Sequence, residues 1–272
     1  HDERRAAPLI LGHEAAGVIV GGTRDGEQVT INPLVSCGTC PACLAGRDNL
    51  CPDRQIISMP PRQGAFAEWV TMPDQNLVTV PKDIPLEKAA LAEPIACGWH
   101  AVKLALAAVR NDPSKLKVLV IGGGAIGLGA AISAQALGVQ NITMLEPNDV
   151  RRDYLLKNCG QKVLSPDALK SGSDFDIVVD GVGYEATRET ASAQVKPGGV
   201  IAHIGLGSAV GGLDIRRMTL QEITFIGTYT YTAQDFRETA QAIFDGSLGN
   251  LDWTETRSLA DGKMAFDNIR SG

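Results

Sequence analysis

The chain has 272 residues, of which 44% are hydrophobic and 21% are charged, with a net charge of −6 and a pI near 5.3. Such a chain can bury one large core or two moderate ones, and we expect two domains. The negative charge leaves no broad basic surface for nucleic acid or anionic lipid, so we expect neither a nucleic-acid nor a membrane partner. No apolar signal segment opens the chain, which favours a cytoplasmic protein.

Residues 1 to about 90 carry the pattern of a β-rich domain. The short runs GVIV, QVTINPL, AEWVTM and NLVTV are separated by Gly, Pro and Asp, as strands of such a domain are. The pattern then changes to helical spacing in EKAALAEPIACGWHAVKLALAAV, which predicts the link into a second domain.

The second domain alternates predicted strands and helices. KVLVIG, NITMLE, FDIVVDGVG and VIAHIGLG are short and largely apolar, and three helical patterns lie between them. This alternation predicts right-handed crossovers and a doubly wound parallel sheet that is buried on both faces. A further helix is predicted over AQDFRETAQAIFDG. The uncharged stretch 118–145 is long enough for a membrane helix, but its glycines and amides favour strand, turn, helix and strand.

Four of the six cysteines lie in CGTCPACLAGRDNLC, with the spacing C-x2-C-x2-C-x7-C: Cys37, Cys40, Cys43 and Cys51. Two-residue gaps let a tight loop fold several thiolates around one tetrahedral ion, which favours structural zinc. An iron–sulfur cluster or two disulfides remain open as alternatives, the latter in an oxidising compartment. Four thiolates fill the coordination shell of zinc, so this site would hold a lobe together and do no chemistry.

A glycine motif follows the first predicted strand of the second domain. VLVIGGGAIG supplies G-x-G-x-x-G at Gly122, Gly124 and Gly127, and a predicted helix starts within it. In a dinucleotide site the first glycine allows a tight turn, the second lets the backbone approach a pyrophosphate, and the third lets the helix pack on the strand. Ala125 and Ile126 open the helix, whose N-terminus would face the phosphate charge, and they complete the predicted site.

Glu146 ends the next predicted strand, nineteen residues after Gly127. An acid at this position binds the adenosine ribose hydroxyls of NAD and repels the extra phosphate of NADP; an acid placed there by chance is the alternative. Arg151 and Arg152 follow, and an arginine in this region can instead accommodate that phosphate. We interpret both chiefly as a solvated helix face and keep Arg151 among the candidate cofactor residues.

Six motifs succeed one another in a characteristic order: GHEAAG, the four-cysteine segment, GAFAEWV, EPIACGWHA, VLVIGGGAIG and VKPGGVIAHIGLG. From about residue 12 to residue 227 the chain thus resembles the zinc-dependent medium-chain dehydrogenases, the alcohol and polyol dehydrogenase family. The resemblance implies a GroES-like catalytic domain (1–97), a Rossmann NAD-binding domain (98–235) and a return segment to the catalytic domain (236–272). It also implies an active site between the domains, the cofactors zinc and NAD, and a homo-oligomer.

The same resemblance assigns roles to residues that say little in isolation, since metal sites need several converging groups. His13 matches the catalytic-zinc histidine, and Glu14 matches the adjacent acid that ligates the zinc or lies beside it. Glu93 falls where sorbitol- and threonine-dehydrogenase-like members have Glu and liver-type alcohol dehydrogenases have Cys. Cys97 is then interpreted as a cleft residue near the nicotinamide, and Gly205 as part of the cofactor site. Glu93 and TYTYTAQDF together resemble the polyol branch.

Two departures from the family pattern concern the beginning of the chain. The first catalytic ligand of the family, a Cys well before GHE, has no counterpart in the twelve residues before His13, and the proton-relay residues are missing with it. The segment between GHE and GEQV is also short. We interpret this as a missing start; the alternative is a protein without catalytic zinc. The predicted function is reversible oxidation of an alcohol, expected to be a polyol, by NAD. A zinc-free quinone reductase and a non-catalytic NAD-binding scaffold are the alternatives.

Overall fold

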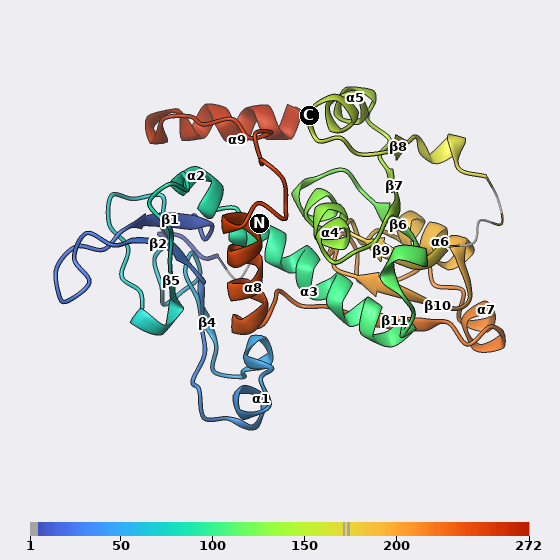
Figure 1. Ribbon diagram of the computed structural model, residues 1–272, viewed down its shortest axis with the longest axis horizontal. Coiled ribbons are helices and arrows are strands. Elements are labelled where there is room, and N and C mark those ends of the chain that lie inside the picture. Colours follow the sequence, from blue (N-terminus) through green and yellow to red (C-terminus); the bar gives the residue numbers. More distant parts are fainter. Residues whose placement is uncertain (1–4, 171, 173–174, 272) are drawn as a thin grey trace.

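The computed structural model describes residues 5–170, 172 and 175–271. Figure 1 shows a small β-rich lobe and a larger α/β lobe, with helix α3 (Ala92–Val109) running between them. The four-cysteine segment, which contains α1 (Pro41–Leu44), projects from the β-rich lobe. Within the described ranges, no helix has the length and apolarity needed to cross a membrane.

The β-rich lobe is built on short antiparallel strands. One sheet has the order β1-β2-β5, formed by β1 (Ala15–Val18), β2 (Gln28–Ile31) and β5 (Leu77–Thr79), while β3 (Leu34–Val35) pairs with β4 (Gln55–Ile56). The inward side chains Val29 and Ile31 of β2 are buried. Short helical turns connect the strands: η1 (Asp48–Leu50), η2 (Asp74–Asn76) and α2 (Leu86–Ala89).

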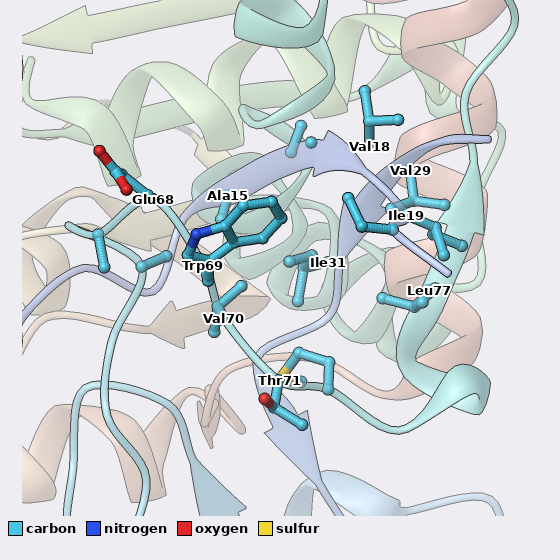
Figure 2. Close-up of a pocket in the computed structure, with 16 residues that line it drawn as sticks. Ala15, Val18, Ile19, Val29, Ile31, Glu68, Trp69, Val70, Thr71 and Leu77 are labelled. Carbon is cyan, nitrogen blue, oxygen red and sulfur yellow. The ribbon is translucent and has the colours of Figure 1, made fainter. Parts of the chain in front are cut away.

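The strand expected at AEWVTM is wrong. The backbone of Ala65 and Phe66 donates to the carbonyls of Gly12 and Leu11, but residues 67–72 join no sheet. They run along one side of a groove whose other walls are β1, β2 and β5. Figure 2 shows the Trp69 ring over this groove. A strand needs backbone pairing with a neighbour, and this segment forms none within the described part of the chain.

The larger lobe contains one parallel sheet in the order β11-β10-β9-β6-β7-β8. Its strands are β6 (Lys117–Ile121), β7 (Asn141–Leu145), β8 (Val163–Leu164), β9 (Phe175–Asp180), β10 (Val195–His203) and β11 (Thr224–Gly227). Read from β8, this is the order of a doubly wound dinucleotide fold, in which strands are added on one side of β6 as far as β8 and then on its other side from β9. The predicted fold class is confirmed.

Both faces of the sheet are covered by helices. Val118 and Val120 of β6 face a core shared with α3, α4 (Ala125–Ala136), α5 (Asp149–Asn158) and α8 (Ala233–Phe244). Leu119 and Ile121 face a second core with α6 (Glu185–Gln194) and α7 (Ile215–Leu220). The burial of both faces explains why β6 is apolar at every position after Lys117. Helices α3 and α4 approach so closely at Gly98 that a Cβ there would lie 2.3 Å from the amide nitrogen of Ala130.

Helix α8 is fixed to α3 by a buried ionic cluster. The Asp235 carboxylate lies 2.7 Å from His100 Nδ1 and 2.6 Å from Lys103 Nζ, and it accepts a hydrogen bond from Thr232. Burial alone would raise the pKa of Asp235, but these hydrogen bonds outweigh it and hold that pKa well below its usual range.

The predicted domain boundaries at 97/98 and 235/236 fall inside α3 and α8, and the division remains a proposal. The segment after α8 contains α9 (Gly262–Ser271), which is exposed.

Candidate metal centres and nucleotide site

The four cysteines come together at the tip of the projecting segment. Their sulfur atoms all lie within 4.8 Å of one another. Cys43 Sγ is 3.9 Å from Cys37 Sγ and 3.5 Å from Cys40 Sγ. Four thiolates at zinc bond length around a tetrahedral ion are separated by about 3.8 Å, so this cluster fits such an ion. None of the six cysteines forms a disulfide, which agrees with the metal reading over the disulfide reading.

The local backbone favours the thiolate form of Cys37. Cys40 N donates to Cys37 Sγ at 3.3 Å, and the Thr39 hydroxyl lies 3.7 Å from the same sulfur. Hydrogen bonds from the Thr39 and Cys40 amides lower the pKa of Cys37 to about 6. Neighbouring Cys51 is fully buried and accepts from Cys37 N. The segment is therefore arranged to hold a cation through its sulfur atoms.

A second group forms where the β-rich lobe meets α3. His13 and Glu14 lie just before β1, and Glu93 lies in the first turn of α3; one ligand atom of each is within 4.8 Å of the others. Burial and the charge of Arg5 lower the pKa of His13, which keeps its imidazole neutral, as a metal ligand must be. Imidazole nitrogen and carboxylate oxygen are both zinc ligands, so the donor atoms of this group fit a zinc ion.

Glu93 is the buried member of this group, with a relative exposure of 6%. Burial raises the pKa of Glu93 to about 8; the charge of Glu14 adds to this, although the Tyr231 hydroxyl donates a hydrogen bond that acts in the opposite direction. Two acids that meet in a poorly solvated place are best satisfied by a cation between them. Cys97, one helical turn further along α3, does not join the group.

An apolar cavity adjoins the second group. Leu11, Phe66 and Phe266 line it together with His13 and Glu14. The two phenylalanine rings meet edge to face at 6.3 Å. A small molecule bound here would therefore place a polar group at His13 and Glu14 while its carbon skeleton contacts aromatic rings.

The glycine motif forms the turn from β6 into α4. Gly122 has a φ of +99°, which favours glycine, and a Cβ on Gly127 would lie 1.9 Å from the Gly122 carbonyl oxygen. Gly124 is the N-cap of α4, and a Cβ there would meet nothing within 4 Å. The helix that begins at Ala125 thus presents free backbone N–H groups to an open space, which fits a bound pyrophosphate.

Glu146 lies directly beneath this turn at the end of β7, and it is buried. Its Oε2 accepts from Gly123 N at 2.9 Å and its Oε1 accepts from Asn148 N at 2.9 Å. Each carboxylate oxygen can accept more than one hydrogen bond, so capacity remains for ribose hydroxyls. Glu146 therefore both fits the predicted ribose contact and braces the glycine turn. Gly205 packs against another turn of the same sheet end, where a Cβ would lie 2.4 Å from Gly183 N.

The interpretation as a solvated helix face fits Arg151, which is exposed, but not Arg152, which is partly buried. Arg151 Nη1 nevertheless lies 3.4 Å from Glu146 Oε2. Arg152 donates to the carbonyls of Glu146 and Pro147. Both guanidinium groups hold the end of β7, because the turn leaves a carboxylate and two carbonyls that a five-donor group can satisfy.

Comparisons with known proteins agree with this geometry. Residues 1–82 match the family model of the alcohol dehydrogenase GroES-like domain, and residues 125–245 match that of the zinc-binding dehydrogenases. Sorbitol dehydrogenase of Bacillus subtilis is 32% identical over 240 residues, which are 82% of this chain and 67% of the relative. The chain belongs to the zinc-dependent medium-chain dehydrogenase family.

Further similarities place this dehydrogenase among enzymes of varied substrates. A probable D-xylulose reductase A of Neosartorya fischeri is 28% identical over 97% of this chain and 78% of its own length. The structure of acetophenone reductase from Geotrichum candidum, in complex with NAD, has a TM-score of 0.84 at 26% identity and covers 97% of this chain and 78% of that one. The family is thereby shown, and the substrate of this dehydrogenase is a matter for proposal.

The sequence did not indicate one side chain that contacts the second group. Tyr231 contacts Glu93 from 138 residues away, and it is almost fully buried. Spacing carries no signal for such a contact. The only hint was TYTYTAQDF, which was noted for its resemblance to the polyol branch and not for a role of its own.

Replacing Glu146 by Ala in this dehydrogenase should weaken NAD binding by about tenfold and leave NADP binding unchanged or improved, because the acid favours free ribose hydroxyls and repels phosphate. Titration of each nucleotide, followed by fluorescence, measures both dissociation constants. Glu146→Gln is the matched control for the brace, since its carbonyl can still accept from Gly123 N. Equal losses for NAD and NADP in Glu146→Ala would rule out the ribose role.

Proposed function

We propose that the chain oxidises polyols or closely related alcohols to the corresponding carbonyl compounds with NAD. One observation carries the proposal. His13 and Glu14 are far from Glu93 in the sequence, yet the three residues form one group of potential ligand atoms. The family places such chemistry between a GroES-like and a Rossmann-type part, and both parts are present.

His13, Glu14 and Glu93 would hold the catalytic zinc. A zinc ion there would supply a Lewis acid that lowers the pKa of an alcohol hydroxyl, and NAD would supply the hydride acceptor. The protein contributes the arrangement: His13 offers a neutral nitrogen, and the two acids offer negative charge. The neighbouring cavity would orient the carbon skeleton against its phenylalanine rings.

The chain's own residues would also bind the nucleotide. The open N-terminus of α4 at Gly124, Ala125 and Ile126 would receive the pyrophosphate, while Glu146 would accept hydrogen bonds from the ribose. Arg151 would help to orient Glu146. Cys37, Cys40, Cys43 and Cys51 would hold a structural zinc that takes no part in the reaction.

The substrate class is supported by the relatives. Those with the names sorbitol dehydrogenase and D-xylulose reductase point to polyols and their ketoses. Glu93, in place of the cysteine of liver-type enzymes, supports the same branch. We further propose a homo-oligomeric, cytoplasmic enzyme, as the family resemblance implies.

A panel of polyols and simple alcohols, assayed with NAD and with NADP, tests the proposal together with a metal count per chain. We expect two zinc ions and NAD-dependent oxidation of at least one polyol. One zinc ion without activity on any alcohol would instead favour the non-catalytic scaffold. Reduction of quinones with NADPH, without a need for zinc, would favour the quinone reductase alternative.

A further inference from the structure

One buried side chain beside the proposed catalytic centre has no role in the function proposed above. Tyr231 lies in the segment after β11, has a relative exposure of 1%, and donates from its hydroxyl to Glu93 Oε1 at 2.7 Å. The neighbouring Thr230 has a φ of +48°, a backbone conformation that a β-branched residue adopts only when its surroundings enforce it. Contacts with the rest of the structure must therefore hold this segment in place.

The four-cysteine lobe, residues 37–54, holds one side of this segment in place. Asn49 Nδ2 donates to the Tyr229 carbonyl at 2.8 Å, and the Asp48 carboxylate accepts from Ala233 N at 3.0 Å. The Arg54 guanidinium lies 4.8 Å from the centre of the Tyr229 ring. Contacts on both flanks of Tyr231 thus come from η1 and from the residues that follow Cys51.

Helices α3 and α8 provide the other side. The Tyr231 ring packs against Phe236 with ring centres 5.7 Å apart. Thr232 caps α8 together with Asp235, and Asp235 is joined to His100 and Lys103 of α3. The same helix α3 carries Glu93 in its first turn. Tyr231 and Glu93 are consequently fixed to one framework.

We propose that Tyr231 is a positioning residue that orients the Glu93 carboxylate for the catalytic metal, and that the four-cysteine lobe keeps Tyr231 in place. The inference rests on the proposed function, because it needs a metal at His13, Glu14 and Glu93. The hydroxyl occupies one oxygen of Glu93 and leaves the other for the cation. Hydrogen bonds of this kind to ligating carboxylates fix their orientation and tune metal affinity. The four-cysteine site would then support the reaction indirectly, because it keeps Tyr231 and therefore Glu93 in position, although it does no chemistry itself.

Tyr231→Phe tests the first half of the proposal, since it keeps the ring and removes only the hydroxyl. We expect the affinity of the second site for Zn²⁺, measured by competition with a chelator, to fall by about 10- to 100-fold. Cobalt substitution gives a second readout: the absorption of Co²⁺ at the site with nitrogen and oxygen ligands should change, while the charge-transfer band of the four-thiolate site stays constant. Tyr154→Phe is the matched control, because it removes a tyrosyl hydrogen bond to the Trp253 carbonyl on the surface.

Asn49→Ala tests the second half, because it loosens the Tyr229 contact and leaves all four cysteines in place. We expect a smaller loss of Zn²⁺ affinity at the second site, with the four-thiolate band intact. Unchanged affinity and cobalt spectrum in Tyr231→Phe would overturn the positioning role while two bound metal ions left the proposed function standing. Unchanged affinity in Asn49→Ala alone would overturn the role of the lobe. A wild-type chain with one metal ion would overturn the proposed function itself.

Discussion

Replacing Cys40 by Ser should remove one zinc ion per chain and lower the free energy of unfolding by about 3 kcal/mol or more, because metal binding to a structural site contributes directly to folding. The helical turns of the projecting segment bury few side chains of their own. Helix α1 buries no side chain, and η1 buries only Asn49. Thermal denaturation and metal analysis of the purified variant measure both effects.

Cys159→Ser is the control for this variant, since Cys159 is a free, partly buried thiol on the other lobe. It should keep the full metal content and a melting temperature close to that of the wild type. A Cys40→Ser protein that retained both its zinc and its stability would remove the four-cysteine cluster from consideration as a structural metal site. Iron in place of zinc would instead indicate the cluster alternative.

Replacing His13 by Ala should lower kcat/KM for the preferred alcohol by about 1000-fold or more. A Lewis acid stabilises the transition state by several kcal/mol, and His13→Ala would lose this stabilisation. Each 1.36 kcal/mol lost lowers the rate by about tenfold. The neutral nitrogen of His13 has no substitute in the group, whose other two members are acids. Steady-state kinetics with saturating NAD measures the loss, and metal analysis should give one zinc ion in place of two.

Glu68→Gln serves as the control for His13→Ala, because Glu68 is an acid of the same lobe that is not part of either candidate metal group. Its kinetics and metal content should match the wild type. The four-thiolate site and the melting curve of His13→Ala should also be preserved, which separates loss of the catalytic metal from unfolding. Undiminished turnover in His13→Ala would contradict the catalytic assignment.

Features encoded within a few residues were predicted well. The glycine turn is an example, because Gly122 and Gly127 have local reasons to be glycine, a positive φ and a close approach of the chain to itself. The six-stranded sheet was equally accessible, since uniformly apolar strands between helices have few other arrangements. The cysteine spacing likewise needed only one tight segment to bring four thiolates together.

Features that depend on distant partners were not accessible from sequence. AEWVTM has the composition of a strand but pairs with no other strand within the described structure. Arg152 turned inward because the end of β7 exposes carbonyls that no pattern reveals. Tyr231 reaches Glu93 only because α8 and α3 lie together. In each case tertiary contact, and not local preference, decided where the side chain lies.

The hydrogen bond from Gly123 N to Glu146 bears on how nucleotide preference can evolve in this protein. An acid that only repelled phosphate could be exchanged in one step for a small residue. Here the same exchange leaves a buried N–H group without an acceptor, at a cost of about 1–3 kcal/mol. A lineage that moved toward NADP would therefore need a second change, such as a new acceptor or an ordered water below the turn, before the first became tolerable. A change from NAD to NADP in this chain would therefore depend on two substitutions that are tolerated only together.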